Sequence, residues 1–302
     1  MHVHPNAPDW FRRALAVPYE DHTVEVAGCS IHFVAWGEPG RPGIVFVHGG
    51  GAHAHWWTHV AATFASEFRV VAVDLSGHGD SGHREVYALE QWTEEVMAAA
   101  AAGGIAGRPV LVGHSMGGFV TIATAALHGD GVAGLVICDS PVTEPDPEVE
   151  SYRLKQAFGR PRTYESFDEA VARFRTVPGQ DHSLDYVVDH VARHSLRAVP
   201  GGWRWKFDDQ IFVQFAGSMR GIALPYLQRV DCRVALLRSE HGLVTPTIGR
   251  SMFEALGRVA PVIELPEAGH HAMLDVPLTL LSALRTLLAD WEHSDPHHAA
   301  RP

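Results

Sequence analysis

Cysteines, long apolar runs and basic charge are all scarce in this sequence. Only three cysteines occur (Cys29, Cys138 and Cys232), and their wide spacing forms neither a disulfide ladder nor a CxxC metal pair. Such usage suits a reducing compartment, so we expect a cytoplasmic protein. The sequence contains no run of about 18 apolar residues, so we expect no transmembrane helix and no membrane partner.

The charge balance argues against another class of partner. Asp and Glu outnumber Lys and Arg by 35 to 24, which gives a net charge of −11 with neutral histidines. A surface of this sign repels phosphate backbones, so nucleic acid is not an expected partner. The first residues, MHVHPNAPDWFRRALAVPYED, show no basic head followed by an apolar run, so we expect no signal peptide. The sequence does not indicate an oligomeric state.

Histidine, in contrast, is abundant, with 21 residues. The densest cluster is HAHWWTH, which holds His53, His55 and His59. Trp57 stands where a metal centre of the HxHxDH type would need an aspartate, and no HExxH occurs. We therefore expect these to be surface or loop histidines, and we expect no metal site.

Short β-branched runs alternate with helical patterns along the chain, which predicts a mostly parallel sheet. The expected strands are Thr23–Ala27, Ile31–Trp36, Gly43–Val47, Val70–Val73, Pro109–Val112, Val132–Cys138, Arg233–Leu237 and Val262–Leu265. The expected helices between them are His55–Ser66, Leu89–Ala102, Ser115–Leu127, Thr247–Leu256 and Leu278–Trp291. In such a sheet, ligands bind at the carboxyl ends of the strands.

This alternation stops between Pro141 and Pro225. The stretch is richer in charged and aromatic residues and has no clear strand, but SYRLKQAF, FDEAVARFRT and LDYVVDHVARHSL have helical periodicity. We predict a helical cap at residues 141–225. It would be inserted between core segments at residues 1–140 and 226–292, with a disordered tail at 293–302.

The clearest chemical motif is GHSMG, at residues 113–117. It is preceded by the strand pattern VLV and followed by the helical pattern MGGFVTIATAAL, the context that a nucleophile elbow requires. Gly113 and Gly117 remove side chains that would collide with so sharp a turn. The motif therefore predicts Ser115 as the nucleophile.

A second glycine-rich motif, HGGGAHAHWW, begins at His48 after an expected strand. Glycines in such a loop let backbone N–H groups approach a reacting carbonyl. We expect the N–H groups of Gly50 and Met116 to form an oxyanion hole, in which one donor is worth about 10²–10³ in rate. The loop has neither a GK[ST] ending nor a GxGxxG, so nucleotide binding is not expected there.

A histidine is the usual general base near neutral pH. His270 directly follows Gly269 at the exit of the last expected strand, and it comes after Ser115 in the chain, as in hydrolases. We predict His270 as the base, and the adjacent His271 is the alternative.

Together these motifs resemble those of the α/β-hydrolase superfamily. GHSMG resembles its nucleophile elbow, HGGG its oxyanion loop, DLSGHGDS its loop after the fourth strand and AGHHAMLDVP its histidine segment. The resemblance covers about Thr23 to Trp291. It implies an α/β-hydrolase fold, with a mostly parallel eight-stranded sheet flanked by helices and an inserted helical cap. It also implies a serine-dependent site without a cofactor, because Ser115 excludes members with an aspartate nucleophile, such as haloalkane dehalogenases and epoxide hydrolases.

The chain departs from the family pattern at the acid of the triad. The family usually places an aspartate in the loop after the seventh strand, where this sequence has His241 or Gly242. We predict Asp139, at the end of the sixth strand, as the acid, and Glu240 is the alternative. Asp275 is expected to cap the last helix.

The substrate is a small molecule on this interpretation. We predict that Trp203 and Trp205, in the aromatic stretch GGWRWKFDDQIF, form a wall of the substrate pocket; ordinary packing inside the cap is an equal alternative. The predicted reaction is hydrolysis of a small to medium carboxylic ester or lactone through an acyl-enzyme. The alternatives are C–C bond hydrolysis of a β-diketone-like substrate and a hydrolase-like ligand-binding protein with slow turnover.

Overall fold

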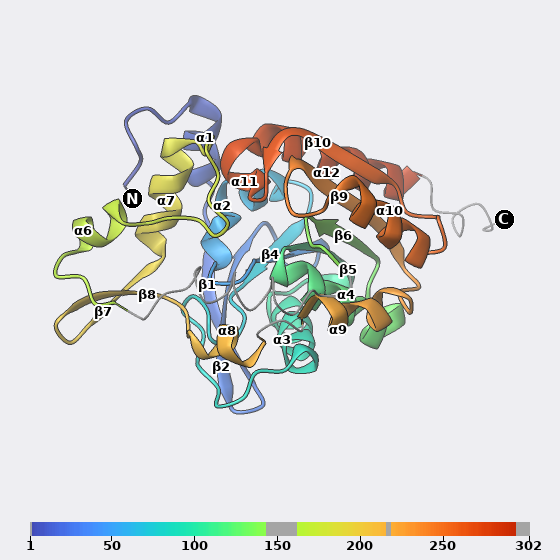
Figure 1. Ribbon diagram of the computed structural model, residues 1–302, viewed down its shortest axis with the longest axis horizontal. Coiled ribbons are helices and arrows are strands. Elements are labelled where there is room, and N and C mark those ends of the chain that lie inside the picture. Colours follow the sequence, from blue (N-terminus) through green and yellow to red (C-terminus); the bar gives the residue numbers. More distant parts are fainter. Residues whose placement is uncertain (1, 143–161, 216–218, 294–302) are drawn as a thin grey trace.

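The computed structural model describes residues 2–142, 162–215 and 219–293, and its central element is an eight-stranded sheet (Figure 1). The strand order is β1-β2-β4-β3-β5-β6-β9-β10. These strands are β1 (Glu20–Val26), β2 (Cys29–Trp36), β3 (Pro42–Val47), β4 (Arg69–Val73), β5 (Ala106–His114), β6 (Gly134–Cys138), β9 (Arg233–His241) and β10 (Val262–Gly269). Strand β2 pairs antiparallel with β1 and β4, and all other neighbours pair parallel. The expected sheet is confirmed.

Helices lie on both faces of this sheet (Figure 1). Those that the structure describes outside residues 141–225 are α1 (Asp9–Leu15), η1 (Ala54–Trp56), α2 (Thr58–Ala61), η2 (Ala62–Phe64), α3 (Leu89–Ala102), α4 (Met116–His128), η3 (Gly129–Gly131), α10 (Pro246–Ala255), α11 (Ala272–Asp275) and α12 (Pro277–His293). Within the described residues, no helix is long and apolar enough to cross a membrane.

The central strands bury side chains on both of their faces, and β3 illustrates why. Successive side chains of a strand point to opposite faces. Val45 and Val47 accordingly enter the core under α3 and α4, while Ile44 and Phe46 enter the core under α1, α2 and α12. An unbroken apolar run is therefore required, and the truncation of Phe46 to Ala would cost about 3–5 kcal/mol.

The helix expected at residues 55–66 was predicted wrongly as one element. The chain forms three short turns there, η1, α2 and η2. The run of His, Trp, Thr and Val has weak helix propensity. Just before this segment, the N–H of Ala54 donates to the buried carboxylate of Asp74 at 2.6 Å.

Residues 141–225, called the insert below, contain both helices and strands. The described elements are α6 (Phe167–Ala172), α7 (Asp185–His194), β7 (Leu196–Val199), β8 (Gly202–Trp205), α8 (Gln210–Gln214) and α9 (Met219–Leu227), which ends two residues beyond the insert. Strands β7 and β8 form an antiparallel hairpin, so the expectation of an insert without strands is wrong. Alternating tryptophans favour a strand, and Gly201 turns the chain at a φ of 86°. SYRLKQAF and most of the predicted tail lie outside the described residues, and the domain boundaries stay a prediction.

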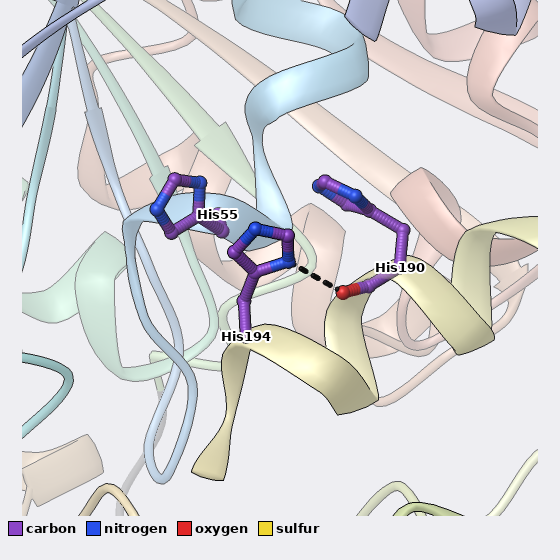
Figure 2. Close-up of side chains that lie close together, drawn as sticks. All are labelled: His55, His190 and His194. Atoms are coloured by element: carbon purple, nitrogen blue, oxygen red, sulfur yellow. Dashed lines mark hydrogen bonds between the residues drawn. The ribbon is translucent and has the colours of Figure 1, made fainter. Parts of the chain in front are cut away.

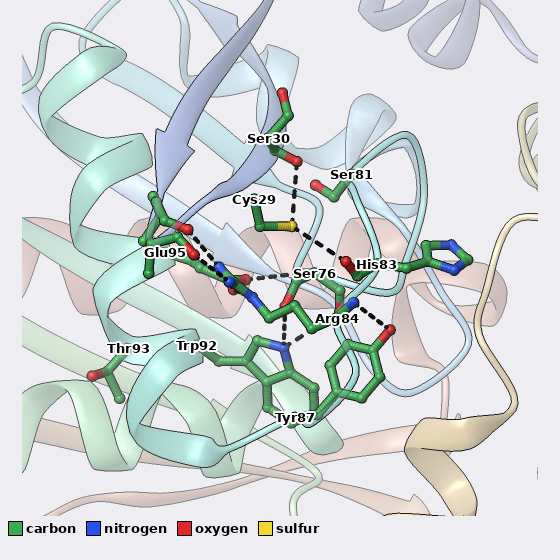
Figure 3. A network of polar contacts seen from close by, with 12 residues as sticks. Cys29, Ser30, Ser76, Ser81, His83, Arg84, Tyr87, Trp92, Thr93 and Glu95 are labelled. Carbon is green, nitrogen blue, oxygen red and sulfur yellow. Dashed lines mark hydrogen bonds and ion pairs between the residues drawn. The ribbon is translucent and has the colours of Figure 1, made fainter.

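A buried ion pair fixes the loop that follows β4 (Figure 3). Glu95 of α3 is fully buried and accepts hydrogen bonds from the Ser76 N–H at 2.7 Å and from Arg84 Nε at 3.0 Å. Arg84 also donates to the carbonyl oxygen of Val26, at the end of β1. Burial raises the pKa of Glu95 despite these partners. The network ties α3, the first hairpin and the loop after β4 together, and removal of one partner would cost about 3–5 kcal/mol.

Candidate active site

Ser115 stands at a strained turn between β5 and α4. Its φ is 54° and its ψ is −119°, a backbone conformation that is costly for a residue with a side chain. A Cβ atom at Gly113 would lie 2.4 Å from the carbonyl oxygen of Gly117, and one at Gly117 would lie 2.4 Å from that of His48. Both glycines are therefore required for the sharp turn that presents the Ser115 hydroxyl at the sheet edge.

A chain of two hydrogen bonds connects Ser115, His270 and Asp139. The Nε2 atom of His270 lies 3.0 Å from Ser115 Oγ, and its Nδ1 atom lies 2.6 Å from Asp139 Oδ2. Because Nδ1 donates its proton to the carboxylate, Nε2 carries the lone pair and accepts from the Ser115 hydroxyl. His270 and Asp139 are buried, while Ser115 is half-buried. The structure thus brings together three residues that the sequence singled out.

Asp139 follows β6 at a φ of 43° and is surrounded by donors. Besides His270, the N–H groups of Leu243 and Val244 donate to its carboxylate at 2.7 and 3.1 Å. Burial alone would raise the pKa of Asp139. The hydrogen bond and charge of His270, together with these N–H groups, outweigh burial and lower that pKa. The carboxylate is therefore held in its ionised form beside His270.

The two other carboxylates considered for this position contact different groups. Glu240 is exposed and accepts from the N–H of Glu267 at 2.8 Å. Asp275 accepts from the N–H of Gly269 at 2.6 Å and from that of Val276 at 2.8 Å. The expectation that Asp275 caps the last helix is wrong, because α12 begins at Pro277 and its N-cap position is Val276. Through these two bonds, Asp275 instead stabilises the backbone before and after His270.

Sequence reasoning missed the part played by His114, the variable residue of GHSMG. His114 Nε2 donates to the carbonyl oxygen of His270 at 2.8 Å, and its side chain is buried. Burial and the neighbouring His270 lower the pKa of His114 to about 3, so it is neutral. His271 packs its ring against Trp56, with ring centres 5.3 Å apart. Position alone gave no signal for His114, because any residue satisfies that place in the motif.

The glycine-rich loop after β3 passes beside Ser115. A Cβ atom at Gly49 would lie 3.2 Å from Ser115 Cβ, so the backbone comes close to the hydroxyl. His48 fixes this loop, since its Nδ1 donates to the Gly49 carbonyl and its Nε2 accepts from the Leu75 N–H at 3.1 Å. Among the described residues, neither the Gly50 N–H nor the Met116 N–H donates a hydrogen bond to a protein acceptor. Both N–H groups therefore stay available to an incoming oxygen.

The histidines of HAHWWTH, His53, His55 and His59, were expected to be surface or loop residues, and the expectation of a surface position was wrong because all three are buried. The sequence could not predict this, because it does not show which helices lie beside this loop. His53 Nε2 donates to Ser195 Oγ at 2.8 Å, and His59 Nε2 donates to the carbonyl oxygen of Met273 at 2.7 Å. These bonds connect the loop after β3 with the insert and with α11.

A cavity of about 360 Å³ opens above Ser115, between the glycine-rich loop and the insert. Its aromatic lining consists of Trp56, Tyr164, Phe174, Trp205 and Phe207. Trp203 is not among the lining residues. It packs edge-to-face on Phe167, with ring centres 4.9 Å apart. Residues two apart on a strand lie about 6.6 Å from each other, so Trp205 can line the cavity while Trp203 does not. The prediction that both tryptophans form a wall of the pocket is therefore wrong for Trp203.

The charged side chains along this cavity are all basic among the residues that the structure describes. They are Arg162, Arg173, Arg175 and Lys206, all from the insert, and no aspartate or glutamate lines the cavity with them. Lys206 Nζ also contacts Asp80 Oδ2 at 2.6 Å. This concentration of positive charge contrasts with the net charge of −11 for the whole chain.

A family model described as the alpha/beta hydrolase family matches residues 44–283. The chain belongs to this family. The resemblance indicated by the motifs is thereby confirmed for the fold. The crystal structure of E-2-(acetamidomethylene)succinate hydrolase aligns with this alpha/beta hydrolase at a TM-score of 0.76, over 90% of this chain and 100% of that chain. At 21% sequence identity, that likeness supports the fold alone.

Relatives with curated functions are hydrolases of more than one kind. Esterase Rv0045c of Mycobacterium tuberculosis is 26% identical to this alpha/beta hydrolase over 268 residues, which are 86% of each chain. Epoxide hydrolase 4 of Mus musculus is 31% identical over 121 residues, which are 39% of this chain and 33% of that protein. The chain thus matches only about a third of the epoxide hydrolase. Together these relatives support a hydrolase function without specifying its substrate.

Proposed function

We propose that the protein is a serine hydrolase that cleaves a small to medium carboxylic ester or lactone through an acyl-enzyme on Ser115. The observation that carries the proposal is the pair of hydrogen bonds from Ser115 to His270 and from His270 to Asp139, at 3.0 and 2.6 Å. A nucleophile, a base and a carboxylate that orients the base are the parts that acyl transfer needs.

The first half of the reaction forms the acyl-enzyme. His270 Nε2 takes the proton of the Ser115 hydroxyl while Oγ attacks the substrate carbonyl carbon. The N–H groups of Gly50 and Met116 stabilise the negative oxygen of the tetrahedral intermediate. The ionised Asp139 stabilises the imidazolium that forms. When the carbonyl reforms, His270 gives its proton to the leaving alkoxide.

Water completes the cycle by the same steps in the opposite direction. His270 Nε2 accepts a proton from water, whose oxygen attacks the acyl carbon. The second tetrahedral intermediate collapses, and the proton on His270 returns to Ser115 Oγ. The products are a carboxylic acid and an alcohol, or a hydroxy acid from a lactone.

The contact between Asp139 and His270 also bears on the slow-turnover binding protein considered from the sequence. That alternative rested on the missing aspartate near His241 and Gly242. The carboxylate of Asp139, which lies 2.6 Å from His270 Nδ1, supports turnover over that alternative. For C–C bond hydrolysis, no contact among the described residues favours a β-diketone over an ester.

The proposal is tested by labelling with a fluorophosphonate probe and by a p-nitrophenyl ester series of increasing acyl length. Ser115→Ala should abolish labelling and lower kcat on the order of 10⁶-fold, the loss seen when one triad member is removed from a comparable enzyme. Circular dichroism should show an unchanged fold. Labelling that persists in Ser115→Ala would contradict the proposal. A β-diketone assayed in parallel separates the C–C alternative.

A further inference from the structure

Three histidines gather between the insert and the loop after β3, outside the site described above (Figure 2). They are His55 of η1 and His190 and His194 of α7, which lie one helical turn apart. One ring nitrogen from each of the three residues lies within 4.8 Å of the corresponding nitrogens of the other two. The ring of His194 lies between the other two, with ring centres 4.3 Å from His55 and 4.4 Å from His190.

The hydrogen bonds of these rings leave nitrogens unused. His194 Nδ1 donates to the backbone carbonyl of His190 at 2.8 Å, so its Nε2 carries a lone pair. His55 uses its Nδ1 in a hydrogen bond of 3.1 Å with Thr58 Oγ1. Neither ring nitrogen of His190 has a hydrogen-bond partner among the described residues, although this side chain is only 4% exposed. A buried imidazole without a partner is costly, and a metal ion would supply one.

We propose that His55, His190 and His194 bind one divalent transition-metal ion of the zinc type. Imidazole nitrogens suit zinc, copper and nickel, whereas magnesium and calcium prefer oxygen ligands. At metal–nitrogen distances of about 2.0–2.1 Å, tetrahedral ligand nitrogens lie roughly 3.3 Å apart, so small side-chain rotations close the site. The hydrogen bond from His194 Nδ1 to a carbonyl is the outer contact that commonly orients such a ligand.

The environment of the three rings favours the unprotonated form that a metal needs. Burial lowers the pKa of His55 to about 3, and it also lowers the pKa values of His190 and His194. Neutral imidazoles bind a cation without first releasing protons. The ligands belong to η1 and α7, whereas Ser115, Asp139 and His270 follow β5, β6 and β10. The ion would therefore join the insert to the core and take no part in hydrolysis.

The test uses untagged, full-length protein that has been stripped with a chelator. Titration with Co²⁺ should give visible absorption bands that saturate at one ion per chain, and Zn²⁺ should displace them. His194→Gln and His190→Gln should each weaken Co²⁺ binding by at least about 10–100-fold, the loss that outer-contact changes already cause. Zn²⁺ at 100 times its Kd should lower the unfolding equilibrium constant of the wild type by about 100-fold.

Two matched controls separate the cluster from other histidines. His22→Gln removes an exposed histidine, and the double change His297→Gln with His298→Gln removes an adjacent pair near the C-terminal end of the sequence. Both variants should keep the Co²⁺ bands and the affinity of the wild type. Should His190→Gln fail to fold, His194→Gln and the wild-type spectrum carry the test. Equal uptake by wild type and His194→Gln would overturn the proposal, as would loss of the bands in either control.

Fluorophosphonate labelling of Ser115 provides an independent readout in the same samples. The stripped protein should still be labelled, since the ion lies outside the acyl-transfer machinery. Metal uptake and labelling can thus succeed or fail separately, which keeps this proposal distinct from the proposed hydrolase activity.

Discussion

A Cβ atom at Gly242 would lie 2.3 Å from Oδ2 of Asp139, so the loop after β9 can close around this carboxylate only with glycine there. The same loop directs the N–H groups of Leu243 and Val244 at Asp139. The loop in which the family usually carries its acid therefore holds the carboxylate of Asp139, the acid proposed here, which follows β6.

Gly242→Ala should lower kcat for a p-nitrophenyl ester by about 10²-fold, because a displacement of about 1 Å in a catalytic group has an effect of this size. Gly249→Ala, in α10, is the matched control, since its Cβ would meet no atom closer than 3.7 Å. Steady-state kinetics and thermal unfolding of both variants check this. An unchanged kcat in Gly242→Ala would show that the position of Asp139 tolerates displacement.

Asp139→Asn should keep the geometry but lower kcat by up to about 10⁴-fold, because an amide can hold the wrong tautomer of His270. Glu240→Gln is the control and should be mild, since that carboxylate contacts only the Glu267 N–H among the bonds of the described residues. Both variants should be assayed with the same ester. If Glu240→Gln is the damaging change, Asp139 is not the acid.

Trp205→Ala should raise KM for the longest acyl chain by about 10-fold and change it little for acetate esters, because a longer chain makes more contact with the cavity wall. Trp203→Ala should instead lower stability by about 1–3 kcal/mol and leave the relative KM values unchanged, since its ring packs on Phe167. An acyl-length series combined with urea unfolding distinguishes the two. Identical KM profiles for both variants would contradict this assignment.

Esters that carry a carboxylate should be preferred over neutral esters of equal size, because the charged groups lining the cavity are basic. The preference should weaken with added salt, as the screening length falls from about 10 Å at 0.1 M to about 3 Å at 1 M. The measurement is kcat/KM for a matched pair of esters across ionic strength, and Arg173→Gln should reduce the preference. A salt response shared by both esters would argue against charge recognition.

Acid should destabilise the folded protein below about pH 6.5. Burial lowers the pKa of His59 to about 4, so the folded state binds fewer protons than the unfolded state between these values. The contribution of His59 is thus complete above pH 6.5 and is lost as the pH falls towards 4, at up to about 1.4 kcal/mol per pH unit. Urea unfolding at several pH values should show a shallower slope in His59→Gln than in His22→Gln, which removes an exposed histidine.

Sequence patterns predicted what depends on local chemistry. Apolar runs such as Gly43–Val47 must be buried strands, and the glycines around Ser115 require a sharp turn, so the sheet and the elbow could be read directly. Contacts between residues that are far apart in the sequence could not be predicted in this way. The burial of His55 depends on α7, and the failure of Trp203 to reach the cavity depends on where β8 is seated. The part of His114 depends on a carbonyl 156 residues away.

Asp139 precedes the insert by only two residues, and this has a consequence for recombination between related genes. The residues proposed to break the bond all lie outside the insert, whereas most of the residues that line the cavity lie inside it. A double crossover that replaces only residues 141–225 could change the substrate without touching the reaction. A single crossover between Asp139 and Gly242, however, separates the proposed acid from the loop that holds its carboxylate. Asp139 and Leu243, which donates to its carboxylate from a position 104 residues later in the sequence, have to be inherited together.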